Sequence, residues 1–281
     1  MINTIVQGAP IFLLVAVRCF AMLMTLPLFS MRNVPRVAKI ALSGYMAFMV
    51  LPIVYGSSVQ MKQYGFTQDV FSGSFSVEYI MLLLGEGLIG VIIGFYVSII
   101  FAAFSSAGQF FSFQMGFSAA EAYDALSQVE NPLMGQYLNL VAMLVFLQSH
   151  GFQKIFLSGI LKSFETINAY SLVFCKENFV RFLVKGLSEL FLDGLMIALP
   201  LVGTLFLISL TMGLLSKAAP QMNLLSEGLP ITIIVAFLLL LFLLPVMTDL
   251  FEKSFDIAYK NISTLFNQVS KDVSQLDLGV Q

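Results

Sequence analysis

The sequence is poor in the residues on which most enzymes depend. Among its 281 residues are one histidine, two cysteines and no tryptophan, and only 11% are charged. His150 alone cannot form a histidine cluster, and Cys19 and Cys175 lie in or near apolar runs without metal-ligand spacing. No GxxxxGK[ST] loop, HExxH pair or GxSxG turn occurs. We therefore predict a protein that is not an enzyme, with no catalytic residue, no cofactor and no metal.

Basic charge is also scarce. The net charge is -2, whereas a nucleic-acid-binding protein carries a basic face, so we expect no nucleic-acid partner. Residues 1–9 contain no lysine or arginine before the first apolar run, so no cleavable signal peptide is expected. What is abundant is apolar sequence: 58% of the residues are hydrophobic, against about 45–50% in soluble domains. The composition predicts an all-α integral-membrane-type protein.

Six apolar stretches are long enough for membrane-spanning helices, which need roughly 20 residues. Three of them contain ionisable residues, namely Arg18, Glu86 and Asp193. Charges at such depth are costly in lipid and usually face protein or water, so we expect these helices to be covered by protein. The stretches are residues 9–31, 37–56, 77–104, 133–150, 188–216 and 229–248.

The segments between and after these stretches are amphipathic. Residues 152–186 alternate aromatic and basic side chains, which is typical of interfacial helices. From Asp249 onward, apolar residues recur every three or four positions and predict a continuing helix. With six spans, the side holding both termini carries nine Lys and Arg against four on the other side. This bias weakly favours cytoplasmic termini.

Two apolar regions contain candidate packing or subunit contacts. In GEGLIGVIIGF, residues 85–95, Gly90 and Gly94 form a GxxxG pattern that allows close helix approach. Glu86, on the same helix, is expected to make a specific polar contact. Residues 214–233, LLSKAAPQMNLLSEGLPITI, form a connector between two apolar helices. Its candidate residues for turn formation or contact with a neighbouring subunit are Pro220, Gln221, Asn223, Gly228 and Pro230.

The most unusual segment is GQFFSFQMGFSAAEAYDALSQVENP, residues 108–132. It is aromatic, flanked by glycines and free of basic residues. Such a conformable apolar segment can close an aqueous path by excluding water, as hydrophobic constrictions do in channels. A connector packed on the helical bundle is the alternative. The candidate plug residues are Gly108, Phe110, Phe111, Phe113, Met115, Gly116 and Phe117.

The order and spacing of four motifs resemble the FliR/SctT family of the type III export apparatus. They are PLFSMRNVPRVAKIAL, EGLIGVIIGF, GQFFSFQMGF with its following acidic residues and VENP, and LLSKAAPQMNLLSEGLPITI. The likeness covers nearly the whole chain, and QMGF and EGLP are more similar to the flagellar branch than to the injectisome branch.

The resemblance implies a subunit of the flagellar export gate, a closed channel through which unfolded flagellar proteins leave the cell. It implies assembly with FliP and FliQ, contact with FlhB, and a place in the bacterial inner membrane at the flagellar basal body, largely above the bilayer plane. It also implies a FliP-like part at residues 1–187 with a pore-plug loop at about 105–132. A FliQ-like hairpin at 188–260 and an amphipathic, frayed tail at 261–281 would follow.

The sequence departs from the family pattern at the plug. Family members commonly have carboxylates where this chain has Gln109 and Ser112, and many have Asp-Pro where it has Asn131-Pro132. Any role of those carboxylates is in doubt here, whereas the glycine and aromatic pattern is intact. Two other functions stay open at this point, a secondary transporter for a small solute and the injectisome counterpart, SctT, of the same gate.

Overall fold

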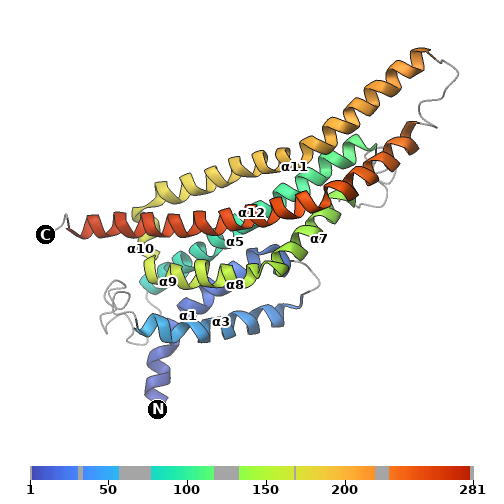
Figure 1. The fold of residues 1–281 in the computed structure, drawn as a ribbon. Coiled ribbons are helices and arrows are strands. Elements are labelled where there is room, and N and C mark those ends of the chain that lie inside the picture. Colours follow the sequence, from blue (N-terminus) through green and yellow to red (C-terminus); the bar gives the residue numbers. More distant parts are fainter. Residues whose placement is uncertain are drawn as a thin grey trace. The chain divides into compact units, whose positions relative to one another are not determined.

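A computed structural model describes residues 2–30, 34–56, 77–116, 133–167, 169–218 and 228–278. All elements in these ranges are helical, which confirms the predicted all-α class (Figure 1). In chain order they are α1 (Ile2–Thr25), α2 (Pro27–Ser30), α3 (Arg36–Gly56), α5 (Val77–Gln114), α7 (Leu133–Gln148), α8 (Gly151–Ile155), the π-helix η3 (Phe156–Leu161), α9 (Lys162–Thr166), α10 (Ala169–Phe174), α11 (Lys176–Ala218) and α12 (Leu229–Leu278).

Fewer than the six predicted spans are found in the part of the chain that the structure describes. Within the described residues four helices, α3, α5, α11 and α12, are long and apolar enough to cross a membrane. A fifth span results if α7 and the helical segment Gly151–Thr166 count as one broken span. The first predicted stretch falls short because its apolar helix, Ala9–Thr25, is only 17 residues long. At 1.5 Å per residue it covers about 26 Å, less than the roughly 30 Å of a hydrocarbon core.

The long helices α11 and α12 include residues that the sequence analysis assigned to amphipathic segments. α11 begins at Lys176, within the predicted interfacial region, and α12 continues to Leu278. The helix predicted after Asp249 is therefore confirmed, whereas fraying of the tail at 261–281 stays a prediction. Its apolar stripe includes Phe255, Ile262 and Val269, all buried within the chain.

The chain forms two compact units. Unit 1 comprises Met1–Ser98, His150–Gly186 and Asp256–Gln281, and unit 2 comprises Ile99–Ser149 and Leu187–Phe255. One boundary between the units, at Gly186 and Leu187, lies beside the predicted boundary at residue 187, but each unit combines several segments of the chain. Because the predicted boundaries at residues 187 and 260 express a likeness to two other proteins, they stay a prediction.

Each unit has its own core. In unit 2 five phenylalanines from α5, α7 and α12 pack ring against ring, with centroids 3.9–5.9 Å apart. Aromatic pairs at this spacing add about 0.5–1.5 kcal/mol each beyond the area they bury. In unit 1, α1 packs against α3, and its centre holds a buried ion pair. The five phenylalanines are Phe101, Phe104, Phe146, Phe251 and Phe255.

Candidate functional site

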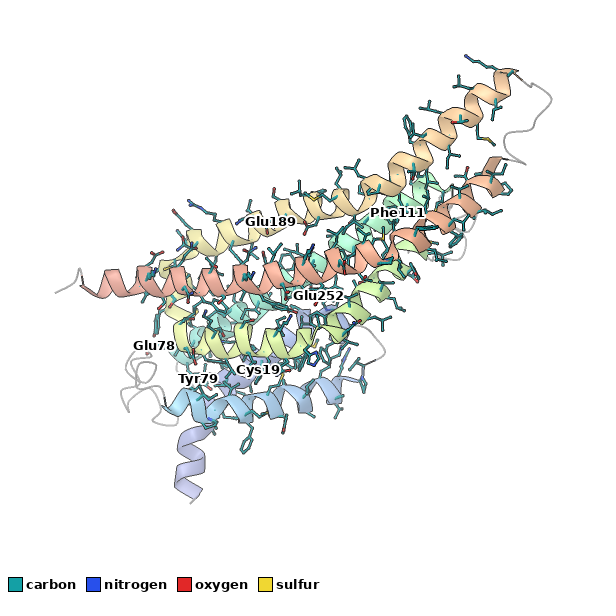
Figure 2. The ribbon with its side chains drawn as sticks, viewed as in Figure 1. Cys19, Glu78, Tyr79, Phe111, Glu189 and Glu252 are labelled. Atoms are coloured by element: carbon teal, nitrogen blue, oxygen red, sulfur yellow. The ribbon has the colours of Figure 1, made fainter. Side chains whose placement is uncertain are left out.

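Arg18 and Glu86 form the centre of unit 1. Both side chains are fully buried, and the Arg18 Nε donates a hydrogen bond of 2.6 Å to the Glu86 carboxylate. Arg18 comes from α1 and Glu86 from α5, so the pair joins two helices that are 68 residues apart in the chain. Cys19 follows Arg18 on α1 and is also buried (Figure 2).

The guanidinium group of Arg18 has three further partners. Its Nη1 donates to the Ser163 hydroxyl at 2.9 Å, and its Nη2 donates to the Ile167 carbonyl at 3.2 Å. Its Cζ lies 4.0 Å from the centre of the Phe164 ring, a cation–π distance. A buried charge is stable only when it is paired and its donors are satisfied, and Arg18 meets both conditions.

This arrangement provides the polar contact expected of Glu86. Arg18 and Glu86 are covered by protein, as expected, and the cover comes from their own chain, in which the two charges neutralise each other. Asp193 is more exposed and accepts a hydrogen bond of 3.3 Å from Ser254, both in unit 2. Sequence reasoning missed Ser163, Phe164 and Ile167, because nothing in the pattern links positions about 145 residues apart.

The glycines of the GxxxG pattern allow α1 to approach α5. A Cβ atom at Gly90 would lie 2.3 Å from the Arg18 carbonyl oxygen. One at Gly94 would lie 2.7 Å from the Met22 carbonyl oxygen. Both distances are shorter than any tolerated contact, so the predicted close approach is present within the chain. A role of this pattern in subunit contact stays a prediction.

We expect Gly90→Ala to destabilise the protein by about 1–3 kcal/mol, because the added methyl group pushes α1 away from α5. Gly44 on α3 offers a matched control, since nothing lies within 4 Å of a Cβ built there. Gly44→Ala should stabilise by up to about 1 kcal/mol through helix propensity. Unfolding midpoints in detergent micelles measure both changes. Equal midpoints for the two variants would show that the α1–α5 crossing is not tightly packed.

The start of the predicted plug loop is helical, which corrects the expected boundary. Residues 105–114 form the last turns of α5. Met115 and Gly116 follow the helix and are the last described residues before α7. Phe117 and residues 118–132 lie outside the described residues. α5 thus extends further than expected, and Phe111 and Met115 of this segment are buried within unit 2.

The two flanking glycines serve different purposes. Gly108 was expected to supply backbone freedom, but it lies in regular helix, where a Cβ would be 2.5 Å from the Met134 carbonyl oxygen. It is therefore a close-packing residue between α5 and α7. Gly116 has φ 82°, in the left-handed region that favours glycine. Gly116 follows the end of α5 in this conformation, which explains the glycine, whereas its role in a plug stays a prediction.

The side chains of this segment divide into two faces, which we call the anchor face and the free face. The anchor face consists of Gly108, Phe111 and Met115, with Phe111 fully buried (Figure 2). The free face consists of Phe110 and Phe113, which are 48% and 72% exposed. Spacings of three and four residues place each set on one side of the helix. One apolar face is thus held by the chain, and the other is left uncovered by it.

The connector between the last two helices is described only at its ends. α11 ends at Ala218 and α12 begins at Leu229, so the predicted break between two apolar helices is confirmed. Gly228 is buried and its carbonyl accepts a hydrogen bond of 2.9 Å from Thr232. Pro230 occupies the first turn of α12, where proline costs no hydrogen bond. Pro220, Gln221 and Asn223 lie outside the described residues.

Metal chemistry finds no support in this arrangement. Across the described ranges, no group of three or more His, Cys, Asp or Glu side chains could hold a metal ion. His150 lies between α7 and α8, where it is the N-cap residue of α8 and has φ 57°. The candidate site has two parts: a buried ion-paired centre in unit 1, and a helix end in unit 2 with one buried face and exposed aromatic side chains on the other.

Known proteins resemble this chain along most of its length. The profile of the family "Bacterial export proteins, family 1" matches residues 9–258. The flagellar biosynthetic protein FliR of Bacillus subtilis is 31% identical over 265 residues, 94% of this chain and 97% of the relative. FliR of Escherichia coli K12 is 30% identical over 261 residues, 93% and 92% of the two chains. FliR of Borreliella burgdorferi is 27% identical over 274 residues, 96% and 97% of the two. The chain belongs to family 1 of the bacterial export proteins.

Proposed function

We propose that this chain is a wall subunit of the flagellar type III protein export gate, in which the free face of Phe110 and Phe113 helps to close the channel. Family membership makes the chain a component of the flagellar export apparatus and an inner-membrane protein. The curated relatives quoted above carry the flagellar name, which favours the flagellar branch over the injectisome counterpart.

The observation that carries the proposal is the two-faced end of α5. A channel seal must be held firmly on one side and must present bulky apolar side chains on the other. The anchor face supplies the first property through fully buried Phe111 and through Met115, which is 1% exposed. The free face supplies the second property. The exposed phenylalanines are therefore available to face a channel, as the proposal requires.

The exposed apolar surface of α12 supports the view that this chain works as part of an assembly and not alone. In the most apolar window of α12 only 11% of the residues are buried within the chain. Leu241 and Phe242 are 72% and 80% exposed. An isolated soluble chain rarely exposes such continuous patches, which mark interfaces with membranes or proteins. We infer that FliP, FliQ and surrounding lipid cover these surfaces, and that FlhB contacts the assembled gate at the flagellar basal body.

The proposed mechanism is passive. An unfolded flagellar protein entering the channel displaces the free face, and the seal returns after the substrate has passed. The anchor face limits the movement to the end of α5. Driving energy comes from other components. The FliP-like part at residues 1–187 and the FliQ-like hairpin at 188–260 would let this one chain complete the wall of the gate.

Co-expression tests the need for partners. We expect the chain expressed alone to aggregate or to be degraded, and the chain expressed with FliP and FliQ to purify as one monodisperse complex. Size-exclusion chromatography with light scattering measures the outcome. A chain that is equally stable and monodisperse without partners would favour the alternative, a self-sufficient transporter.

A further inference from the structure

We propose that unit 1 contains a binding site for the phosphate headgroup of an anionic phospholipid, formed by α5, α11 and α12. The site is a cleft of about 480 Å³, within the range of about 300–1,000 Å³ for small-molecule pockets. This inference does not depend on the proposed gating function. The lining residues are Tyr96, Asn178, Arg181, Phe182, Lys185, Asn261, Thr264, Leu265, Gln268, Lys271 and Asp272.

The charges of the lining favour an anion. Arg181, Lys185 and Lys271 are cationic, against the single carboxylate of Asp272. Asp272 accepts a hydrogen bond of 2.6 Å from the Asn178 amide, which occupies part of its acceptor capacity. The cleft therefore has a formal charge of about +2 in a chain whose net charge is -2. A guanidinium and two ammonium groups are the donors with which proteins bind phosphate.

Neutral donors and an aromatic wall complete the cleft. The Asn261 amide donates to the Tyr96 hydroxyl at 3.0 Å, and the Tyr96 ring stacks on Phe182 with centroids 4.1 Å apart. A Cβ atom at Gly186 would lie 2.5 Å from the Tyr96 ring, so the ring is held closely against α11. Gln268 and Thr264 add an amide and a hydroxyl. Such groups suit the glycerol and ester oxygens of a lipid headgroup.

The position of the cleft in the sequence favours a lipid over a soluble anion. α11 and α12 are both candidate membrane spans, and the cleft uses the charged end of each helix. Beside Arg181 on α11, Val180 and Val184 are 59% and 61% exposed, and Ile257 on α12 is 53% exposed. Basic pockets between apolar helices at the membrane surface bind anionic headgroups. The neighbouring aliphatic side chains offer contact to acyl chains, which a free phosphate would not use.

The thiol of Cys175, which is close enough to Asp272 of the cleft to interact with its charge, carries no charge of its own. Cys175, one residue before α11, is buried, and this burial together with the Asp272 carboxylate raises the pKa of its thiol. The thiol therefore stays neutral at physiological pH and leaves the positive charge of the cleft undiminished.

Native mass spectrometry of the assembled complex tests the site. The complex, extracted from nanodiscs of equal phosphatidylglycerol and phosphatidylcholine, should retain phosphatidylglycerol selectively. Arg181→Gln combined with Lys271→Gln should weaken this retention by about thirtyfold, at about 1 kcal/mol for each basic residue near the lipid surface. Lys176→Gln with Lys260→Gln removes the same charge from exposed positions outside the cleft and should leave retention unchanged. Arg181→Lys should keep most of the binding.

Three results would overturn the proposal. The first is equal loss of phosphatidylglycerol from the cleft variant and from the control variant, which would indicate general charge attraction. The second is no preference for phosphatidylglycerol over phosphatidylcholine. The third is complete displacement of the lipid by 10 mM inorganic phosphate, on the order of cytoplasmic anion concentrations, which would assign the cleft to a soluble anion. Unchanged unfolding midpoints of all variants would exclude misfolding as the cause.

Discussion

Replacing Arg18 with alanine is expected to destabilise the protein by about 3–5 kcal/mol, because the buried Glu86 carboxylate loses the guanidinium group that neutralises it. Both side chains are fully buried, so water cannot replace the lost partner. Glu86→Ala should cost a similar amount, since Arg18 would keep only a hydroxyl, a carbonyl and an aromatic face. Unfolding titrations of the assembled complex in detergent micelles measure these losses, and cellular abundance should fall in parallel.

A double variant distinguishes a paired unit from two independent residues. Arg18→Met with Glu86→Leu replaces both charges by apolar groups, which is often tolerated in a core. We expect it to recover about half of the loss, because Ser163 and the Ile167 carbonyl still lack their donor. Arg36→Ala, at an exposed position on α3, should change stability by less than about 0.5 kcal/mol. Losses that simply add in the double variant would contradict the pairing.

Replacing the free face should make the closed gate leak ions. With Phe110→Ser and Phe113→Ser combined, water is no longer excluded where the two rings stood, and small ions should pass without a substrate. Planar-bilayer recordings of the assembled complex should change from no resolvable current to discrete conductance steps. Because both rings are largely exposed, the fold of the subunit should be little affected.

Two other variants distinguish a loss of the channel seal from a loss of subunit stability. Phe237→Ser with Phe242→Ser removes rings that are 46% and 80% exposed on α12, a close match in size and exposure, and should leave the gate closed. Phe111→Ala removes a ring of the anchor face and should cost about 3–5 kcal/mol of stability. Leakage from the α12 variant equal to that of the free-face variant would locate the barrier elsewhere.

Periodicity and composition predicted the helices well, because apolar repeats dictate which segments must leave water. The helix after Asp249 follows from a stripe of Phe255, Ile262 and Val269, all buried in the structure. The number of spans was less predictable, since hydropathy does not show where a helix begins and ends outside its apolar stretch. α5 and α11 each run beyond the apolar stretch that predicted them, through residues whose partners are distant in the chain.

The candidate site was predictable in kind but not in geometry. The family motifs located the segment that starts at Gly108, and the aromatic pattern indicated bulk. Which phenylalanine is buried depends on the neighbours that α5 meets, and no local pattern records them. Gly108 shows the same limit: its sequence context indicated a conformable backbone, whereas the backbone of Met134 and Gly135 explains why no side chain fits. The partner of Glu86 likewise required a structure.

Site-specific photo-crosslinking tests the central claim most directly. A photoreactive benzoylphenylalanine replaces Phe113 in the assembled gate, and an export substrate fused to a domain that cannot unfold is stalled in transit. The account predicts a strong crosslink between position 113 and the stalled substrate, and none from the same probe at position 242. Absence of a substrate crosslink at 113, or equal crosslinking from 242, would contradict a channel-facing seal at the end of α5.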